Sequence, residues 1–181
     1  MNQQEEEKLV KKAIKGNRKA YGKLVEAYQI YLYKTAFLYV KNEQDALDAV
    51  QNCVMKGMVA IEKLREPAFF KTWLTKILIN NIYREKEKSV PIISLEEYQE
   101  KATESTCSME ERIDLYQAVD LLRPVYKTVI ILYFFSGMKI KEIAEIMDIP
   151  EGTVKGYMAR AKKELKQSLQ EEAYHDQRKS I

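Results

Sequence analysis

The amino-acid sequence predicts an all-α protein made of two small helical domains joined by a flexible acidic linker. Apolar residues recur at helical spacing through most of the chain, and no hairpin turn or long alternating run predicts strands. Residues 89–109 lack this periodicity, contain Pro91 and hold four glutamates against Lys101 alone. We therefore expect a first domain over 1–88, the linker over 89–109, a second domain over 110–170 and a polar tail over 171–181.

Composition limits the class of protein. The 181 residues are 46% hydrophobic and 31% charged, which is typical of a soluble globular chain that can bury a core. The formal net charge of +3 is too small to indicate nucleic-acid binding, so the distribution of charge matters more. Cys53 and Cys107 lack metal-ligand spacing, and the acidic amino terminus lacks signal-peptide chemistry. We expect a cytoplasmic protein with free thiols and no membrane span.

Four helices are predicted in the first half of the chain, over 5–14, about 20–40, 43–64 and 68–87. Gly16 favours a left-handed cap, and Asn17 and Asn42 are placed to cap the next helices. The second range is compatible with one long helix or two nearly continuous ones. The third has an apolar face of Ala46, Val50, Cys53, Val54, Gly57, Met58 and Ile61. The inward residues of the fourth are Phe69 or Phe70, Trp73, Leu74, Ile77, Leu78 and Ile82.

The second half is predicted to hold a helix over 113–122, another from Pro124 through Val125, Val129, Leu132 and Tyr133, and a helix-turn-helix over 139–169. In its first helix Ile140, Ile143, Ala144 and Met147 form a short buried face. Asp148, Pro150 and Gly152 break the pattern. The second helix has one apolar stripe, Val154, Met158, Ala161, Leu165 and Leu169, and a basic exposed face. This arrangement presents a helix to the major groove of DNA, although an αα-hairpin with solvated charges fits the periodicity too.

The sequence offers little material for catalysis or metal binding. Its only histidine, His175, lies in the polar tail, and no glycine-rich phosphate-binding motif occurs. Asp45 and Asp48 lie at i and i+3 beside solvent, where no pocket is indicated. We therefore expect no catalytic residue, no metal, no cofactor and no small-molecule substrate.

Three segments carry a family resemblance: NEQDALDAVQ at 42–51, AFFKTWLTKILINN at 68–81, and the stretch 122–165. The first two resemble region 2, and the third resembles region 4, of extracytoplasmic function sigma factors of bacterial RNA polymerase. The resemblance covers about 5–88 and 110–170. It implies a protein that binds core RNA polymerase and directs it to the promoters of a stress-response regulon, without catalysis of its own. It also implies an anti-sigma factor, often membrane-anchored.

The resemblance also assigns roles to residues. Polymerase contacts are implied on the flap and on the clamp coiled coil of the largest subunit, the latter through Asp45, Leu47, Asp48 and Gln51. Residues 63–70 match the loop that receives a flipped base of the minus-10 element. Contacts there are implied for Lys63, Phe70, Asn80 and Arg84, with Phe70 equally compatible with the core. The residues implied at the minus-35 element are Thr153, Lys155, Gly156, Tyr157, Arg160 and Lys162.

Two positions depart from the family pattern. Gly156 and Tyr157 stand where many relatives have a Ser-Arg pair, so the resemblance does not imply which promoter sequence is read. Two other functions compete with the sigma-factor hypothesis. One is a two-domain repressor or activator that binds duplex DNA without polymerase. The other is a helical adaptor with no DNA role, which leaves the basic helix unexplained.

Overall fold

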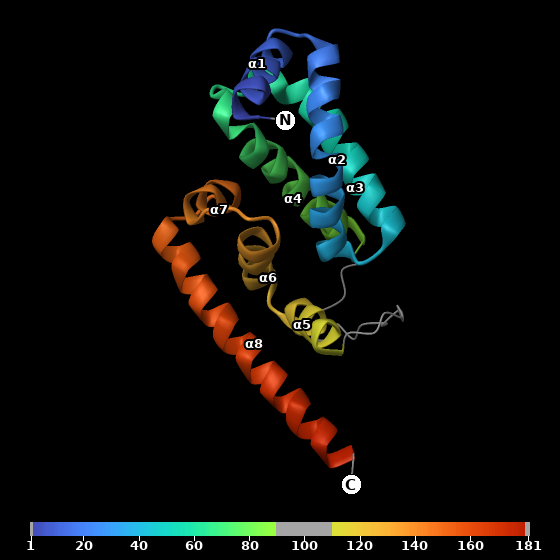
Figure 1. Ribbon diagram of the computed structural model, residues 1–181, viewed down its shortest axis with the longest axis vertical. Helices are drawn as coiled ribbons and strands as arrows, with labels where there is room; N and C mark the ends of the chain where they lie inside the picture. Colours follow the sequence, from blue (N-terminus) through green and yellow to red (C-terminus); the bar gives the residue numbers. More distant parts are fainter. Residues whose placement is uncertain (1, 90–109, 180–181) are drawn as a thin grey trace.

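A computed structural model describes the backbone of residues 2–89 and 110–179, with side chains over 2–85 and 115–170. Every regular element in these ranges is a helix (Figure 1), so the predicted all-α class is confirmed. The predicted linker lies almost wholly outside the described residues. We refer to the described residues up to 89 as the N-terminal half and to those from 110 as the C-terminal half.

Helix α2 (Arg18–Val40) begins at the predicted cap, whereas α1 (Gln3–Ile14) begins two residues earlier than predicted, with Asn2 as its cap. The Asn17 side-chain oxygen accepts a hydrogen bond from Ala20 N at 3.0 Å. Gly16 adopts a left-handed φ of 85°, as predicted for the end of α1. Because α2 continues without a break for 23 residues, the range left open in the sequence is one long helix.

Helix α3 (Glu43–Ala60) is followed by two short 3₁₀ turns, Ile61–Lys63 and Pro67–Phe69, and then by α4 (Phe70–Ser89). The third helix therefore ends four residues earlier than predicted, because the chain tightens before it turns toward Pro67. Helix α3 packs against both α2 and α4. Gly57 makes this close approach possible, since a Cβ there would collide with the Tyr21 hydroxyl and lie 3.3 Å from Leu74.

The C-terminal half consists of α5 (Glu110–Leu121), α6 (Pro124–Ile130), a π turn (Ile131–Phe135), α7 (Ile140–Met147) and α8 (Glu151–Lys179). Val125 and Tyr133 were expected on the inward face of one regular helix, but both are exposed. In the π turn, Ser136 N bonds to Ile131 O at 3.0 Å, and this wider winding moves the following side chains off the 3.6-residue stripe. Helix α8 also runs beyond the predicted end at Leu169, because no glycine or proline interrupts it.

The two halves pack against each other. In Figure 1, α7 lies between α4 and α8, and α4 and α7 are in contact. The π turn of the C-terminal half also reaches α2. The buried apolar residues of both halves form one continuous cluster. Four buried polar side chains form hydrogen bonds between the two halves. They are Thr35, Thr72, Thr128 and Ser136.

Candidate nucleic-acid interface

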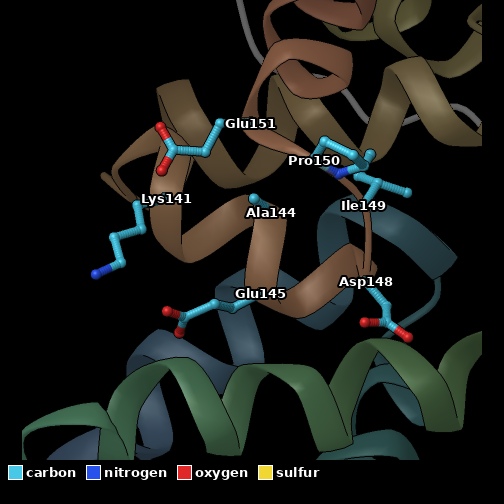
Figure 2. A pocket seen from close by; sticks show the side chains of 7 residues that line it. All are labelled: Lys141, Ala144, Glu145, Asp148, Ile149, Pro150 and Glu151. Atoms are coloured by element: carbon cyan, nitrogen blue, oxygen red, sulfur yellow. The ribbon is translucent and has the colours of Figure 1, made fainter.

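The corner between α7 and α8 is built by local hydrogen bonds. Glu142 caps the start of α7, because its Oε2 accepts from Lys139 N at 2.7 Å. Asp148 ends α7 in a left-handed conformation with φ 56°. Pro150 then opens α8, and its carbonyl accepts from Thr153 N at 2.9 Å. Figure 2 shows the side chains around this corner, with that of Glu145 on the side of α4. The predicted helix-turn-helix is therefore present.

The set of buried residues in this motif differs from the set that the sequence predicted. Ile143, Ala144, Val154, Met158 and Ala161 are buried as expected. Ile146, which lies outside the predicted stripe, is buried as well, whereas the predicted core residues Ile140 and Met147 are only partly buried. Helix α7 packs against α4 in addition to α8, so two of its sides are covered.

The residues expected at the minus-35 element divide into two groups. Lys155, Arg160 and Lys162 are exposed on α8, and Thr153 and Gly156 are partly exposed. Tyr157 instead packs its ring on Tyr126 of α6, with the ring centres 5.6 Å apart. Tyr157 lies about 60° around the helix from the buried Val154, since each residue adds about 100°. Its ring therefore supports the motif from the side.

One of these cations already has an aromatic neighbour. The Lys162 ammonium lies 5.4 Å from the centre of the Phe134 ring, in cation–π geometry. Phe134 belongs to the π turn and is itself exposed. No helical spacing predicts this pair, because it depends on the π turn that carries Phe134.

The residues expected to dock on polymerase all lie on the solvent side of α3. Asp45, Leu47, Asp48 and Gln51 are exposed, and Leu47 retains 47% of its accessible surface. Asn42 fixes the start of the helix by accepting from Asp45 N at 3.0 Å. Acidic side chains in this first turn are also favoured by the helix dipole. The geometry thus leaves two carboxylates free of the core and available to a partner.

The same face continues as an apolar surface toward the end of α3. Met55, Met58 and Val59 are exposed by 60%, 45% and 81%. Met58 was expected in the core, and that expectation is wrong, because the buried stripe of α3 passes from Cys53 to Gly57 and leaves position 58 on the outer side. Sequence reasoning missed this surface; the signal was available in Met55 and Val59, which fall outside any inward stripe.

The residues expected at the minus-10 element are exposed, with one exception. Lys63, Asn80 and Arg84 are accessible to solvent. Phe70 is fully buried, and its ring packs on those of Tyr28 and Trp73 with centres 5.6 and 5.9 Å away. In this structure Phe70 is therefore a core residue and not a base contact, since no part of its ring is accessible.

Burial also perturbs ionisable groups inside the protein. It raises the pKa of the Cys53 thiol to about 12, and it raises the pKa of the Tyr21, Tyr31 and Tyr83 hydroxyls above their usual range. Cys53 and Tyr21 are buried in the core, and Tyr31 and Tyr83 pack against it.

Within the part of the chain whose side chains are described, no group of three potential metal ligands gathers. None of the described helices is long and apolar enough to cross a lipid bilayer.

In the comparison with known proteins, each half of the chain matches its own family model. The family model of sigma-70 region 2 matches residues 24–90, and that of sigma-70 region 4 matches 112–165. The RNA polymerase sigma factor SigV of Bacillus subtilis is 38% identical over 144 residues, which cover 77% of this chain and 85% of SigV. The chain belongs to the extracytoplasmic function sigma factors. This sigma factor therefore binds core RNA polymerase and directs transcription from promoters.

Two further sigma factors are similar to this chain, one in sequence and one in fold. The ECF RNA polymerase sigma factor SigW of Bacillus subtilis is 26% identical over 180 residues, covering 91% of this chain and 96% of SigW. A solved structure of the sigma factor RpoE from Bartonella quintana, in complex with the anti-sigma factor NepR, matches with a TM-score of 0.66. It is 24% identical, and the match covers 84% of this chain and 98% of RpoE. These findings favour the sigma-factor hypothesis over the repressor and adaptor hypotheses.

Proposed function

We propose that this sigma factor docks on core polymerase through the outer face of α3, with Asp45, Leu47, Asp48 and Gln51 as its central contacts. The observation that carries the proposal is that all four side chains are exposed along one helix whose opposite side is buried. The exposed carboxylates can pair with arginines of the clamp coiled coil in the largest polymerase subunit. Since these charges are at the surface, salt should weaken the contact.

The apolar continuation of this face belongs to the same docking surface. Met55, Met58 and Val59 follow Gln51 by about one to two turns of α3 and are exposed as described above. A charged region that adjoins exposed apolar side chains is typical of a protein interface. Methionine suits such a surface because its unbranched side chain adapts to the partner.

The DNA contacts are proposed for the exposed residues of both halves. We assign Lys63, Asn80 and Arg84 to the minus-10 element. Flipping a base out of the DNA stack costs a few kcal/mol. Stacking and hydrogen bonds at this site must therefore contribute a comparable favourable free energy. The assignments at the minus-35 element are Thr153, Lys155, Gly156, Arg160 and Lys162, with Tyr157 supporting the helix from α6. A base contact from Lys155 or Arg160 is worth about 1 to 3 kcal/mol.

Control by an anti-sigma factor is the second part of the proposal. The match to RpoE in complex with the anti-sigma factor NepR supports it. We propose that such a partner, often membrane-anchored in this family, keeps the protein from polymerase until a stress signal arrives. The protein then acts in the cytoplasm, where the chromosome lies, and has no catalytic activity of its own.

The test is run-off transcription with purified core polymerase. Addition of the protein should start transcripts at specific promoters, and mapped start sites should share minus-10 and minus-35 elements. If the protein shifts a duplex probe by itself at physiological salt but adds nothing to core polymerase, it is a repressor or activator and the proposal fails.

The docking face is tested by charge reversal. Asp48→Arg should abolish binding to core polymerase and leave the fold intact, because the side chain is exposed. Glu26→Arg on the exposed side of α2 is the matched control, and its affinity for core should stay close to that of the wild type. Unchanged core affinity of Asp48→Arg would remove Asp48 from the interface.

A further inference from the structure

Lys162 differs from the other exposed cations of α8 because its side chain has a fixed neighbour. Its ammonium lies over the Phe134 ring, 5.4 Å from the ring centre. In the part of the chain whose side chains are described, no hydrogen bond, ion pair or ring contact holds the side chains of the other exposed cations on this helix. They are Lys155, Arg160, Lys163 and Lys166.

The Phe134 ring is itself held by the π turn. The Tyr133 ring packs edge-on against it, with the ring centres 5.0 Å apart, and the turn is closed by the hydrogen bond from Ser136 N to Ile131 O. Phe134 nevertheless retains 53% of its accessible surface, so its position does not serve burial in the core. Local π winding is frequent at functional sites. The contact with Lys162 gives this exposed ring a role outside the core.

An aromatic neighbour holds a cation without cancelling its charge. A carboxylate in the same place would neutralise the Lys162 ammonium, whereas the Phe134 ring attracts it through the negative face of its π system. A lysine side chain loses rotamer freedom when it is fixed, and in Lys162 part of that loss occurs before any partner binds. Lys162 is therefore a pre-organised positive charge at the protein surface.

The position of Lys162 on α8 indicates which part of DNA it meets. It lies about three turns after the start of α8 at Glu151, and about 80° around the helix from the buried Val154. Lys162 is therefore on the flank of α8, whereas Gly156 lies on the side opposite the core. Recognition helices contact base edges with their N-terminal residues. A flanking side chain further along the helix faces the edge of the major groove, where the phosphates lie.

We propose that Phe134 is a positioning residue for the minus-35 contact. It holds the Lys162 ammonium at the edge of the major groove, where Lys162 binds a backbone phosphate of promoter DNA. Lys162 then fixes how α8 is seated on the duplex, and discrimination between bases belongs to residues nearer the start of the helix, such as Lys155 and Arg160. This inference rests on the proposed assignment of Lys162 to the minus-35 element.

The test is a double-mutant cycle on promoter binding by the full-length protein assembled with core polymerase. The probe is a duplex that carries a promoter mapped by run-off transcription. Phe134→Leu should weaken binding about two- to fivefold, because Lys162 must then be ordered on binding, and Phe134→Tyr should bind like the wild type because it keeps a ring. In a Lys162→Gln background, Phe134→Leu should cause no further loss.

The salt dependence of binding identifies the phosphate contact. Lys162→Gln should lower the slope of log affinity against log salt concentration by about one, and it should weaken binding by the same factor for every minus-35 sequence. Phe134→Leu should leave the slope unchanged, because the charge of Lys162 is still present. A change of sequence preference in Lys162→Gln would make Lys162 a base contact and overturn this assignment.

A spectroscopic measurement separates positioning from a general effect on stability. Protons that lie over the face of an aromatic ring resonate upfield, so the ε-methylene protons of Lys162 should be shifted upfield in the free protein. The shift should persist in Phe134→Tyr and disappear in Phe134→Leu, while thermal unfolding stays the same. Phe37→Leu changes an exposed ring on α2 and is the matched control, which should alter neither the shift nor promoter binding. An unshifted resonance in the wild type would overturn the pair.

The outcomes separate this inference from the proposed function. If Phe134→Leu binds the promoter as tightly as the wild type, or weakens binding equally with and without the Lys162 side chain, Phe134 does not position Lys162. Unchanged affinity and salt slope in Lys162→Gln would remove Lys162 from the minus-35 contact, and this inference with it. Failure of the wild-type protein with core polymerase to bind any promoter would instead contradict the sigma function itself.

Discussion

The Tyr83 hydroxyl of α4 lies 2.6 Å from the Thr128 hydroxyl of α6. The same hydroxyl is 3.1 Å from the carbonyl of Pro124, to which Thr128 also donates at 2.9 Å. Edge-on packing against Tyr39, with ring centres 6.3 Å apart, holds the Tyr83 ring in place. One tyrosine thus links α4 of the N-terminal half to α6 of the C-terminal half.

Removing that hydroxyl should loosen the two halves. Tyr83→Phe keeps the ring and deletes the bonds to Thr128 and Pro124, so the free energy of unfolding should fall by about 1 kcal/mol in urea titrations. Tyr133→Phe changes an exposed tyrosine of the π turn and serves as the control. Equal stability of the two variants would mean that the Tyr83 hydroxyl contributes nothing to the contact.

The close approach of α2 and α3 should make one glycine indispensable. Gly57→Ala places a methyl group against the Tyr21 hydroxyl, which donates to Val54 O at 2.9 Å, and should destabilise the fold by about 1 to 3 kcal/mol. At Gly22 a Cβ meets nothing within 4 Å, so Gly22→Ala should stabilise α2 by up to about 1 kcal/mol. Thermal or urea unfolding measures both. A stabilised Gly57→Ala protein would show that α2 and α3 can separate without cost.

Buried tyrosines predict a loss of stability at alkaline pH. Burial raises the pKa of Tyr21, Tyr28, Tyr31, Tyr39 and Tyr83 above the ordinary value of about 10. Above that pH the unfolded chain loses protons that the folded protein keeps, so stability is complete below about pH 10 and falls as the pH rises further. Urea titrations at several pH values should show this decline.

Comparison with Tyr83→Phe isolates one group in this pH series. The variant lacks one of the raised hydroxyls, so its stability should fall less steeply with pH than that of the wild type. Parallel curves for the two proteins would mean that Tyr83 ionises in the folded state as easily as in the unfolded one.

Gly156 offers a test of how closely α8 approaches DNA. A Cβ at this position meets nothing within 4 Å, so packing inside the protein does not require glycine. Gly156→Ala should therefore stabilise the free protein by about 1 kcal/mol. If the backbone at Gly156 lies against the major groove, transcription should fall in spite of the added stability. Gly22→Ala, stabilised to a similar extent far from α8, is the control; equal transcription by the two variants would place Gly156 away from DNA.

Much of the fold could be predicted from local signals. Asn17 and Asn42 cap the helices they precede, Gly16 ends α1, and the corner at Asp148 and Pro150 produces the helix-turn-helix. Each of these depends on a few neighbouring residues, so spacing and residue type are sufficient. The exposure of Asp45 and Asp48 on α3 was predicted from spacing in the same way.

Other features required packing information. Phe70 and Phe69 are adjacent aromatic residues, and only the positions of Tyr28 and Trp73 decide that Phe70 is the buried one. Met58 is apolar but lies on the outer side of α3. The π turn shifts Tyr133 and Phe134 outward, and nothing in a 3.6-residue pattern predicts an i+5 hydrogen bond.

The sequence by itself determined the helices, the helix-turn-helix and the family, because capping residues, apolar spacing and motifs are all properties of short segments. Only the tertiary structure decided how the two halves meet. Lys71 and Lys76 donate to the backbone carbonyls of Ser136 and Glu145. Every residue has a backbone carbonyl, so the sequence does not indicate which carbonyl will accept a hydrogen bond from a lysine. Only the folded structure determines which carbonyl lies next to each lysine.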